Sequence, residues 1–144
     1  MKFKNGFVAL LVTLICISSY AGDFRVSCFS SLSDCSTKVA DLVTDKFTQR
    51  FPKSHFKIAV VAEFQRYSDG GGVGYAVAGV SPVLKDNTTQ FPISRFASTV
   101  RIKDRKMSPY DVTKETEELL RSAVEQLMAA CDSSPSCDVH TPYK

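Results

Sequence analysis

The chain has 144 residues, of which 44% are hydrophobic and 23% are charged, and its formal net charge is +3. This length corresponds to one ordinary domain. Two of the basic residues, Lys2 and Lys4, belong to an N-terminal targeting segment; without them, 18 − 2 = 16 basic residues face 15 acidic ones, a net charge of +1. Nucleic-acid-binding domains normally carry a larger, clustered positive excess, so the composition disfavours a nucleic-acid partner.

Residues 1–21 have the pattern of a signal peptide. Two lysines precede an apolar run of 11 residues, 7–17, and Ser19-Tyr20-Ala21 places small residues where a signal peptidase cuts, before Gly22. An uncleaved anchor is the alternative, but a bilayer span needs about 20 apolar residues. Lipid attachment at Cys16 is a third reading, and the residues before it, 13–15, fit a lipobox poorly.

We therefore expect a periplasmic or secreted protein with no stable membrane span after signal cleavage. Residues 22–144 are predicted to form a single exported domain with a loose C-terminal tail. An even number of cysteines in an exported chain favours disulfides, here two. A zinc site is less favoured, because the gaps of six and five residues exceed the usual two to four, and we expect neither a metal nor another cofactor. The cysteines are Cys28, Cys35, Cys131 and Cys137.

The first elements are a short apolar stretch and a helix. Residues 23–29 are expected to form either an extra edge strand or a tethered leader. Residues 35–51 are predicted to form the first helix, which Pro52 ends. Its apolar residues fall at steps of four, the spacing of one helix face: Val39, Val43, Phe47 and Phe51.

A β-hairpin is the centre of the predicted fold. Apolar residues alternate along residues 56–64, which predicts a strand with one face on the core. The glycine run 70–72 then favours a turn, a second strand covers about 73–80, and Pro82 ends the pairing. A phosphate-binding loop is disfavoured because a helix does not follow the glycines and no Gly-Lys-Ser/Thr occurs.

A third strand is predicted over about residues 93–103, after a polar loop. That loop contains Asn87-Thr88-Thr89, a glycosylation triplet that matters only if the source is eukaryotic. One face of the strand is more apolar and is expected to join the core, which leaves a basic row exposed. That row indicates either an anionic partner or an edge strand protected by charge. The apolar face comprises Phe96, Ser98, Val100 and Ile102, and the other carries Arg95, Arg101 and Lys103.

The second helix has a well-marked start. Ser108 is an N-cap residue, Pro109 suits the first helical position, and Asp111 lies three residues after the cap. The helical spacing of apolar residues continues to about Ala130.

The predicted fold class is α+β: a three-stranded antiparallel meander with both helices on one face, in the order α-β-β-β-α, and two disulfides. Both helices then point the same way, which puts Cys35 and Cys131 at opposite ends. Because bonded cysteines need Cα atoms within about 7 Å, the local pairs Cys28–Cys35 and Cys131–Cys137 are favoured. The alternative is a leader that crosses the sheet and brings Cys28 to the C-terminal loop.

The second face of this sheet lacks a covering helix, so it is expected to contact a partner, a second copy of the chain or the leader strand. The residues assigned to it are Val61, Tyr67, Ala76 and Ala78.

The sequence lacks a recognisable catalytic set. None of its serines lies in a nucleophile elbow such as Gly-x-Ser-x-Gly. The two histidines, His55 and His140, are far apart in the chain, and Glu63 is the one acid on the mixed face of the hairpin. We therefore expect that the protein is not an enzyme.

The leading hypothesis is an exported, disulfide-bonded protein-binding module, of the inhibitor, immunity or adaptor type, that acts by protein–protein contact. Its predicted contact residues are Lys57, Tyr67, Arg95, Arg101 and Lys103.

Two alternatives remain. The order helix, hairpin, third strand, helix behind a signal peptide is similar to that of the curli secretion factor family, a resemblance in element order rather than in a shared motif. It implies an accessory factor for secretion or assembly, acting as a homo-oligomer. The other alternative is a hydrolase of unrecognised type that uses His55 or His140.

Overall fold

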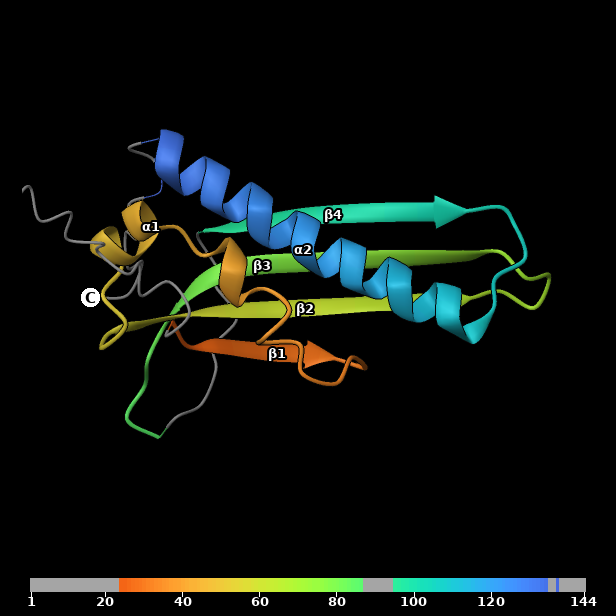
Figure 1. The fold of residues 1–144 in the computed structure, drawn as a ribbon, viewed down its shortest axis with the longest axis horizontal. Helices are drawn as coiled ribbons and strands as arrows, with labels where there is room; N and C mark the ends of the chain where they lie inside the picture. Colours follow the sequence, from red (N-terminus) through yellow and green to blue (C-terminus); the bar gives the residue numbers. More distant parts are fainter. Residues whose placement is uncertain (1–23, 87–94, 135–136, 138–144) are drawn as a thin grey trace, which may run out of the picture.

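A four-stranded sheet with one long helix across it forms the body of the protein (Figure 1). The structure, a computed structural model, describes residues 24–86, 95–134 and 137, so the predicted signal peptide, Asn87, His140 and most of the C-terminal tail lie outside the described residues. The sheet order is β1-β2-β3-β4. The strands are β1 (Val26–Ser30), β2 (Phe56–Arg66), β3 (Gly72–Pro82) and β4 (Phe96–Lys103), and helix α2 spans Pro109–Ser133.

The predicted hairpin is confirmed. Strands β2 and β3 pair antiparallel along 11 residues each, from Phe56 opposite Pro82 to Arg66 opposite Gly72. The turn closes through the Tyr67 amide, which donates to the Gly71 carbonyl at 2.8 Å. Gly70 has a φ of 101°, a conformation that costs glycine little and other residues more.

The predicted three-stranded antiparallel meander is wrong in one respect, because the sheet has a fourth, parallel strand. Strand β1 pairs parallel with β2, from Val26 opposite Ile58 to Ser30 opposite Ala62. This confirms the edge-strand alternative for the stretch that begins the domain. Parallel neighbours need a crossover of a dozen or more residues, and the long segment between β1 and β2 provides it.

The predicted continuous first helix over residues 35–51 is also wrong. The segment forms a 3₁₀ turn, η2 (Ala40–Leu42), and a short helix, α1 (Asp45–Arg50). Between them Val43 is extended, and the Thr44 hydroxyl accepts a hydrogen bond from the Phe47 amide, so α1 begins with a new N-cap. The apolar residues at steps of four are nevertheless all buried: Val39, Val43, Phe47 and Phe51.

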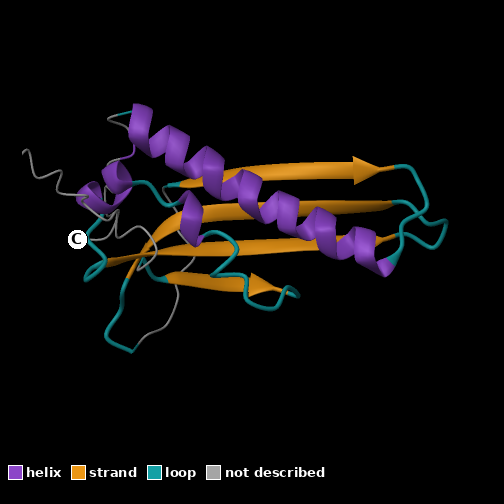
Figure 2. Cartoon of the chain, in the orientation of Figure 1, coloured by secondary structure: helices purple, strands orange, loops and turns teal. Residues whose placement is uncertain are grey.

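The start of α2 is confirmed in detail. The Ser108 hydroxyl accepts from the Asp111 amide, and the Asp111 carboxylate accepts from the Ser108 amide, which completes a capping box with Pro109 at the first helical position. The helix ends at Ser133, one turn beyond the predicted Ala130. Its buried stripe lies over the sheet, with η2 and α1 on the same side (Figures 1 and 2).

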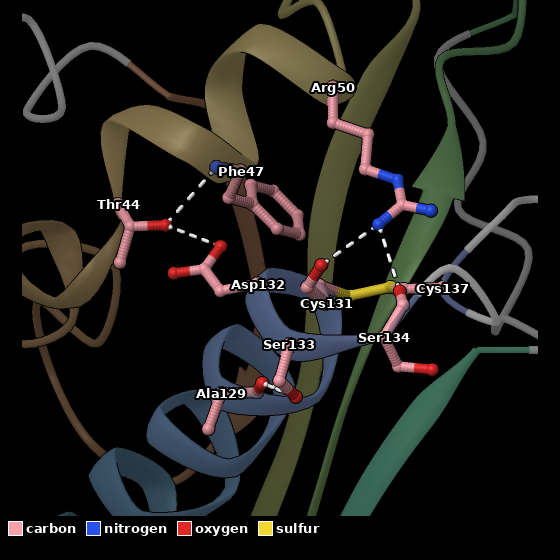
Figure 3. The surroundings of a disulfide bond; sticks show 9 residues. All are labelled: Thr44, Phe47, Arg50, Ala129, Cys131, Asp132, Ser133, Ser134 and Cys137. Atoms are coloured by element: carbon pink, nitrogen blue, oxygen red, sulfur yellow. Dashed lines mark hydrogen bonds between the residues drawn. A yellow bond between two sulfur atoms is a disulfide. The ribbon is translucent and has the colours of Figure 1, made fainter.

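The predicted local disulfides are confirmed. Cys28 bonds to Cys35 with Cα atoms 6.1 Å apart, and Cys131 bonds to Cys137 with Cα atoms 4.7 Å apart. The second bond closes the end of α2, where an Arg50 guanidinium nitrogen donates to the carbonyls of Cys131 and Ser134 at 2.9 and 3.0 Å (Figure 3). Two disulfides fit an exported protein. In the described part of the chain, every helix is too short or too polar to cross a membrane.

The two faces of β4 are the reverse of the prediction. Phe96, Val100 and Ile102 are 58%, 64% and 67% exposed, and the alternate residues face α2. The cause lies in the register with β3. Ala97 and Thr99 lie opposite Ala78 and Ala76.

Ala76 and Ala78 are fully buried in the core beneath α2, not on the uncovered face to which the sequence assigned them. Because directly opposite residues share a face, Ala97 and Thr99 of β4 must face α2 too.

Candidate functional site: the open face of the sheet

The face of the sheet that points away from α2, called the open face below, is the candidate functional site. Strand alternation and register place its residues in rows that run across the strands. One row runs from Phe29 through Val61 and Val77 to Ser98, and the next joins Glu63, Tyr75 and Val100. The third joins Gln65, Val73 and Ile102. The described helices all lie on the other side (Figure 2).

Apolar side chains are exposed on one part of the open face. Those with the largest exposed fractions there are Phe29 (50%), Tyr75 (43%), Phe96 (58%), Val100 (64%) and Ile102 (67%). The face is closed at the other end of β2 and β3, where Ala59, Lys57 and Ser81 are at most 1% exposed. The accessible apolar surface is therefore concentrated on β4 and the neighbouring half of the hairpin, with Phe29 exposed separately on β1 at the other edge of the sheet.

This surface has few groups suited to chemistry. Glu63 is the one charged residue in the three rows named above, and its side chain is exposed. Contiguous exposed apolar surface on a soluble protein commonly marks a contact with another protein. The open face therefore offers mainly apolar side chains for packing.

The basic residues of β4 lie on the opposite face and are paired with α2. A guanidinium nitrogen of Arg101 lies 2.6 Å from a carboxylate oxygen of Glu118 and 3.5 Å from one of Glu115. The Lys103 ammonium lies 2.8 Å from the other oxygen of Glu115. The exposed basic row predicted from the sequence is thus a set of ion pairs between strand and helix.

These pairs also set the ionisation of Glu115, whose side chain is 8% exposed. Burial raises the pKa of the Glu115 carboxyl, but hydrogen bonding and charge from Lys103, and then from Arg101, outweigh it and hold the pKa below its usual range. Glu115 therefore stays ionised at neutral pH and fixes both basic side chains.

The predicted contact residues do not form one surface. Arg101 and Lys103 lie together on the α2 side, and Arg95 precedes β4 and is half-buried. Tyr67 is 50% exposed beside the hairpin turn, whereas Lys57 is 1% exposed near the opposite end of the hairpin. A contact role stays a prediction for these residues, and Lys57 presents no exposed side chain for it.

The exposed residues of the open face that sequence reasoning placed in the core are Phe96, Val100 and Ile102. Their alternation was recognised, but it was assigned to the core because an apolar row is expected to be buried. The signal that points the other way is the run of small residues in β3, which lets α2 approach on the side of Ala76 and Ala78.

Two of the cavities lined by described residues can be compared with ligand sites. One, of about 140 Å³, lies beside the end of α2 and is smaller than the 300–1,000 Å³ typical of ligand sites. The other, of about 440 Å³, is lined by Phe24, Thr48, Pro52, Lys53 and Ser54, without a histidine or carboxylate. The Nδ1 atom of His55 forms a hydrogen bond with the Ser54 hydroxyl at 2.8 Å. Among the described residues, His, Cys, Asp and Glu side chains form no group of three that could hold a metal ion.

Comparison with known proteins adds little to this site. No family model matches the chain, and no curated protein matches it. Among solved structures, one provisionally described as a lipoprotein from Caulobacter crescentus CB15 is similar at 8% identity and a TM-score of 0.36. The match covers 76% of this chain and 83% of that one. A likeness this distant carries no functional argument here.

Proposed function

We propose that this protein is a small exported, disulfide-bonded binding module that acts by protein–protein contact through the open face. One observation carries the proposal. Three apolar side chains of a single strand, Phe96, Val100 and Ile102, are more than half exposed on the side of the sheet that faces away from α2. Leaving these side chains in water forgoes the free energy of burial, which a bound partner would recover.

The same surface favours a protein over other partners. A row of branched aliphatic and aromatic side chains offers area for packing and few hydrogen-bonding groups. Protein interfaces have an apolar centre of this kind with a polar rim. Glu63 and Gln65, both exposed on β2, supply polar groups beside it.

The decisive experiment is capture of partners from the cell envelope with the purified, disulfide-bonded protein as bait. The variant to compare replaces Val100 and Ile102 with threonine, which keeps the β-branched shape but adds a hydroxyl. Each change removes apolar surface that a bound partner would bury. We therefore expect at least about a tenfold loss of captured partner.

Tyr110→Thr provides the matched control. Tyr110 is 76% exposed at the start of α2, so this variant also removes an apolar group from the surface, but away from the open face. The control is expected to capture the same partner as the wild type. Equal capture by all three proteins would show that the open face is not the contact surface.

The nature of the captured protein separates the possible roles. A soluble enzyme would indicate an inhibitor or immunity protein. An outer-membrane pore, captured by an oligomer of this chain, would instead indicate an accessory factor for secretion or assembly.

The proposed function is not enzymatic. The hydrolase alternative is tested separately with His55→Ala, whose imidazole lies in an exposed segment beside Ser54. Loss of a measured hydrolytic activity in a variant with an unchanged circular dichroism spectrum would support that alternative.

A further inference from the structure

The backbone of β4 is arranged to accept another strand. The Val80 amide donates to the Arg95 carbonyl at 3.2 Å, and the register places these two residues opposite each other. In an antiparallel pair, residues alternate between those bonded to the neighbour and those whose amide and carbonyl point away. Ala97 and Thr99 therefore bond to β3, and the outward amides and carbonyls belong to Phe96, Ser98, Val100 and Ile102.

Strand β4 is the last strand of the sheet among the described residues. Its outward backbone groups and its exposed apolar side chains thus come from the same alternate residues. A strand added at this edge would pair with the backbone of these residues and extend the open face at the same time.

The charge beside this edge is positive. Strand β4 contains Arg101 and Lys103 and no acidic residue; Asp104 follows it and is itself followed by Arg105 and Lys106. The side chains of Arg101 and Lys103 remain 35% and 30% exposed despite their pairing with α2. On the α2 side, an added strand would therefore meet basic groups, and on the other side it would meet apolar ones.

We propose that the β4 edge binds an extended segment of a partner protein in which acidic residues alternate with apolar residues. The proposal rests on the proposed function and specifies the partner of that site. The apolar side chains of the segment continue the open face beside Val100 and Ile102, and its carboxylates lie beside Arg101 and Lys103. Strand addition of this kind takes affinity from backbone hydrogen bonds and specificity from alternate side chains.

Charge disfavours a second copy of this chain in two of the antiparallel registers that keep each face aligned. Antiparallel self-pairing that overlaps residues 96–102 completely, with each face kept in register, places Lys103 opposite Arg95 of the other copy. Shifting the register so that Arg101 meets its own counterpart is no better, because like charges directly opposite each other are destabilising. An acidic strand has neither conflict.

The test measures binding of a synthetic peptide that alternates valine with aspartate over about the length of β4. A second peptide has lysine at every aspartate position. We expect the acidic peptide to bind at least about tenfold more tightly, and its binding to weaken as salt is raised. Equal affinity for the two peptides, or no binding of the acidic one, would overturn the proposal.

Ser98→Pro tests the backbone pairing. Proline lacks an amide hydrogen, and it is tolerated on edge strands where that amide faces outward. We expect Ser98→Pro to weaken acidic-peptide binding about tenfold or more, and Ser98→Ala, which keeps the amide, to bind like the wild type. If Ser98→Pro binds as tightly as Ser98→Ala, the partner is not a strand at this edge.

Amide hydrogen exchange on the wild-type protein gives a readout that needs no variant. Bound acidic peptide should slow exchange at Ser98 and Val100 and leave Ala97 and Thr99, which already bond to β3, unchanged. Uniform slowing would contradict edge pairing.

The oligomeric state of the free protein, measured by sedimentation, tests whether a second copy of the chain occupies the β4 edge. A dimer that is lost in Ser98→Pro would assign the edge to a second copy and overturn the proposal.

Failure here is distinguishable from failure of the proposed function. If Val100→Thr/Ile102→Thr loses its partner while Ser98→Pro does not, the open face stands and the edge proposal is wrong. If Ser98→Pro no longer binds the acidic peptide while the threonine variant still captures every partner, the edge proposal is supported and the open face is not the contact surface.

Discussion

The Lys103 ammonium on β4 lies 2.8 Å from the carboxylate of Glu115 on α2, whose side chain is 8% exposed. This ion pair joins the end of the last strand to the first half of the helix that covers the sheet. Arg101 contacts the same carboxylate. Both basic side chains lie on the face of β4 that the register with β3 turns toward α2, while Val100 and Ile102 lie on the open face.

Glu115→Gln should destabilise the protein at neutral pH and not in acid. The pKa of Glu115 is lower in the folded protein than in the unfolded chain, so its contribution is present above about pH 4.3 and is lost as pH falls through the folded value. We expect a loss of about 1–2 kcal/mol in the free energy of unfolding at pH 7. In acid, once the carboxyl is protonated in the folded protein as well, the two proteins should converge.

Urea unfolding at both pH values measures this, and Glu125→Gln, an exposed change on the same helix, is the control. A deficit of the same size at both pH values would show that the charge of Glu115 is not what matters.

Gly74→Ala should be strongly destabilising, although alanine is the smallest possible addition. A Cβ at this position would overlap the ring of Phe64 and the side chain of Leu119, both buried between β2 and α2. Overpacking of this kind costs about 1–3 kcal/mol. Thermal unfolding measures it, with Ser98→Ala on the exposed side of β4 as the control. Full stability of Gly74→Ala would mean that α2 lies farther from β3 than described.

Arg50→Ala should loosen the end of α2. The guanidinium donates to the carbonyls of Cys131 and Ser134, which the helix itself leaves without an intrahelical partner (Figure 3). Its loss should cost about 1–2 kcal/mol and speed hydrogen exchange of the Ser134 amide, which bonds to Ala130. Arg50→Lys keeps the charge without the planar fork and should recover only part of the effect. Unchanged exchange at Ser134 would exclude a capping role for Arg50.

Each disulfide should contribute comparably to stability. Both close short loops, with sequence separations of 7 and 6, for which loop-closure entropy gives about 2 kcal/mol apiece. Replacing either pair by alanine should therefore lower the unfolding free energy by a similar amount. Non-reducing peptide mapping checks the pairing directly. A peptide linking Cys28 to Cys131 or Cys137 would contradict both the local pairing and the fold described here.

Local signals predicted much of the fold. The capping box at Ser108 and Asp111 depends on residues three apart, and the Gly70–Gly72 turn joins strands that are neighbours in the sequence, so both were predictable. The first helix was not, because Thr44 can cap a new helix as well as sit inside one. The spacing of four residues between apolar positions from Val39 to Phe51 predicts which side chains are buried. It does not distinguish one continuous helix from a segment that is interrupted.

The candidate site depended on a fact that is not local. Alternation separates the side chains of β4 into two rows, but only the pairing of Thr99 with Ala76 decides which row meets α2. An apolar row was therefore assigned to the core and a basic row to the solvent. The carboxylates that pair with Arg101 of the basic row, Glu115 and Glu118, lie beyond a turn, on another element.

Neither disulfide joins one strand of the sheet to another. Cys28 lies in β1 and its partner in the following loop, while Cys131 and Cys137 both lie at the end of α2. Val26 and Ile58 are 58 − 26 = 32 residues apart in the parallel pair, and the Cys28–Cys35 bond inside that segment bridges a sequence separation of only 7. We therefore expect β1 to join the sheet after the more local β2–β3 hairpin has formed. Because neither disulfide fixes the strand order, we expect a fully reduced chain, although less stable, to favour the same topology.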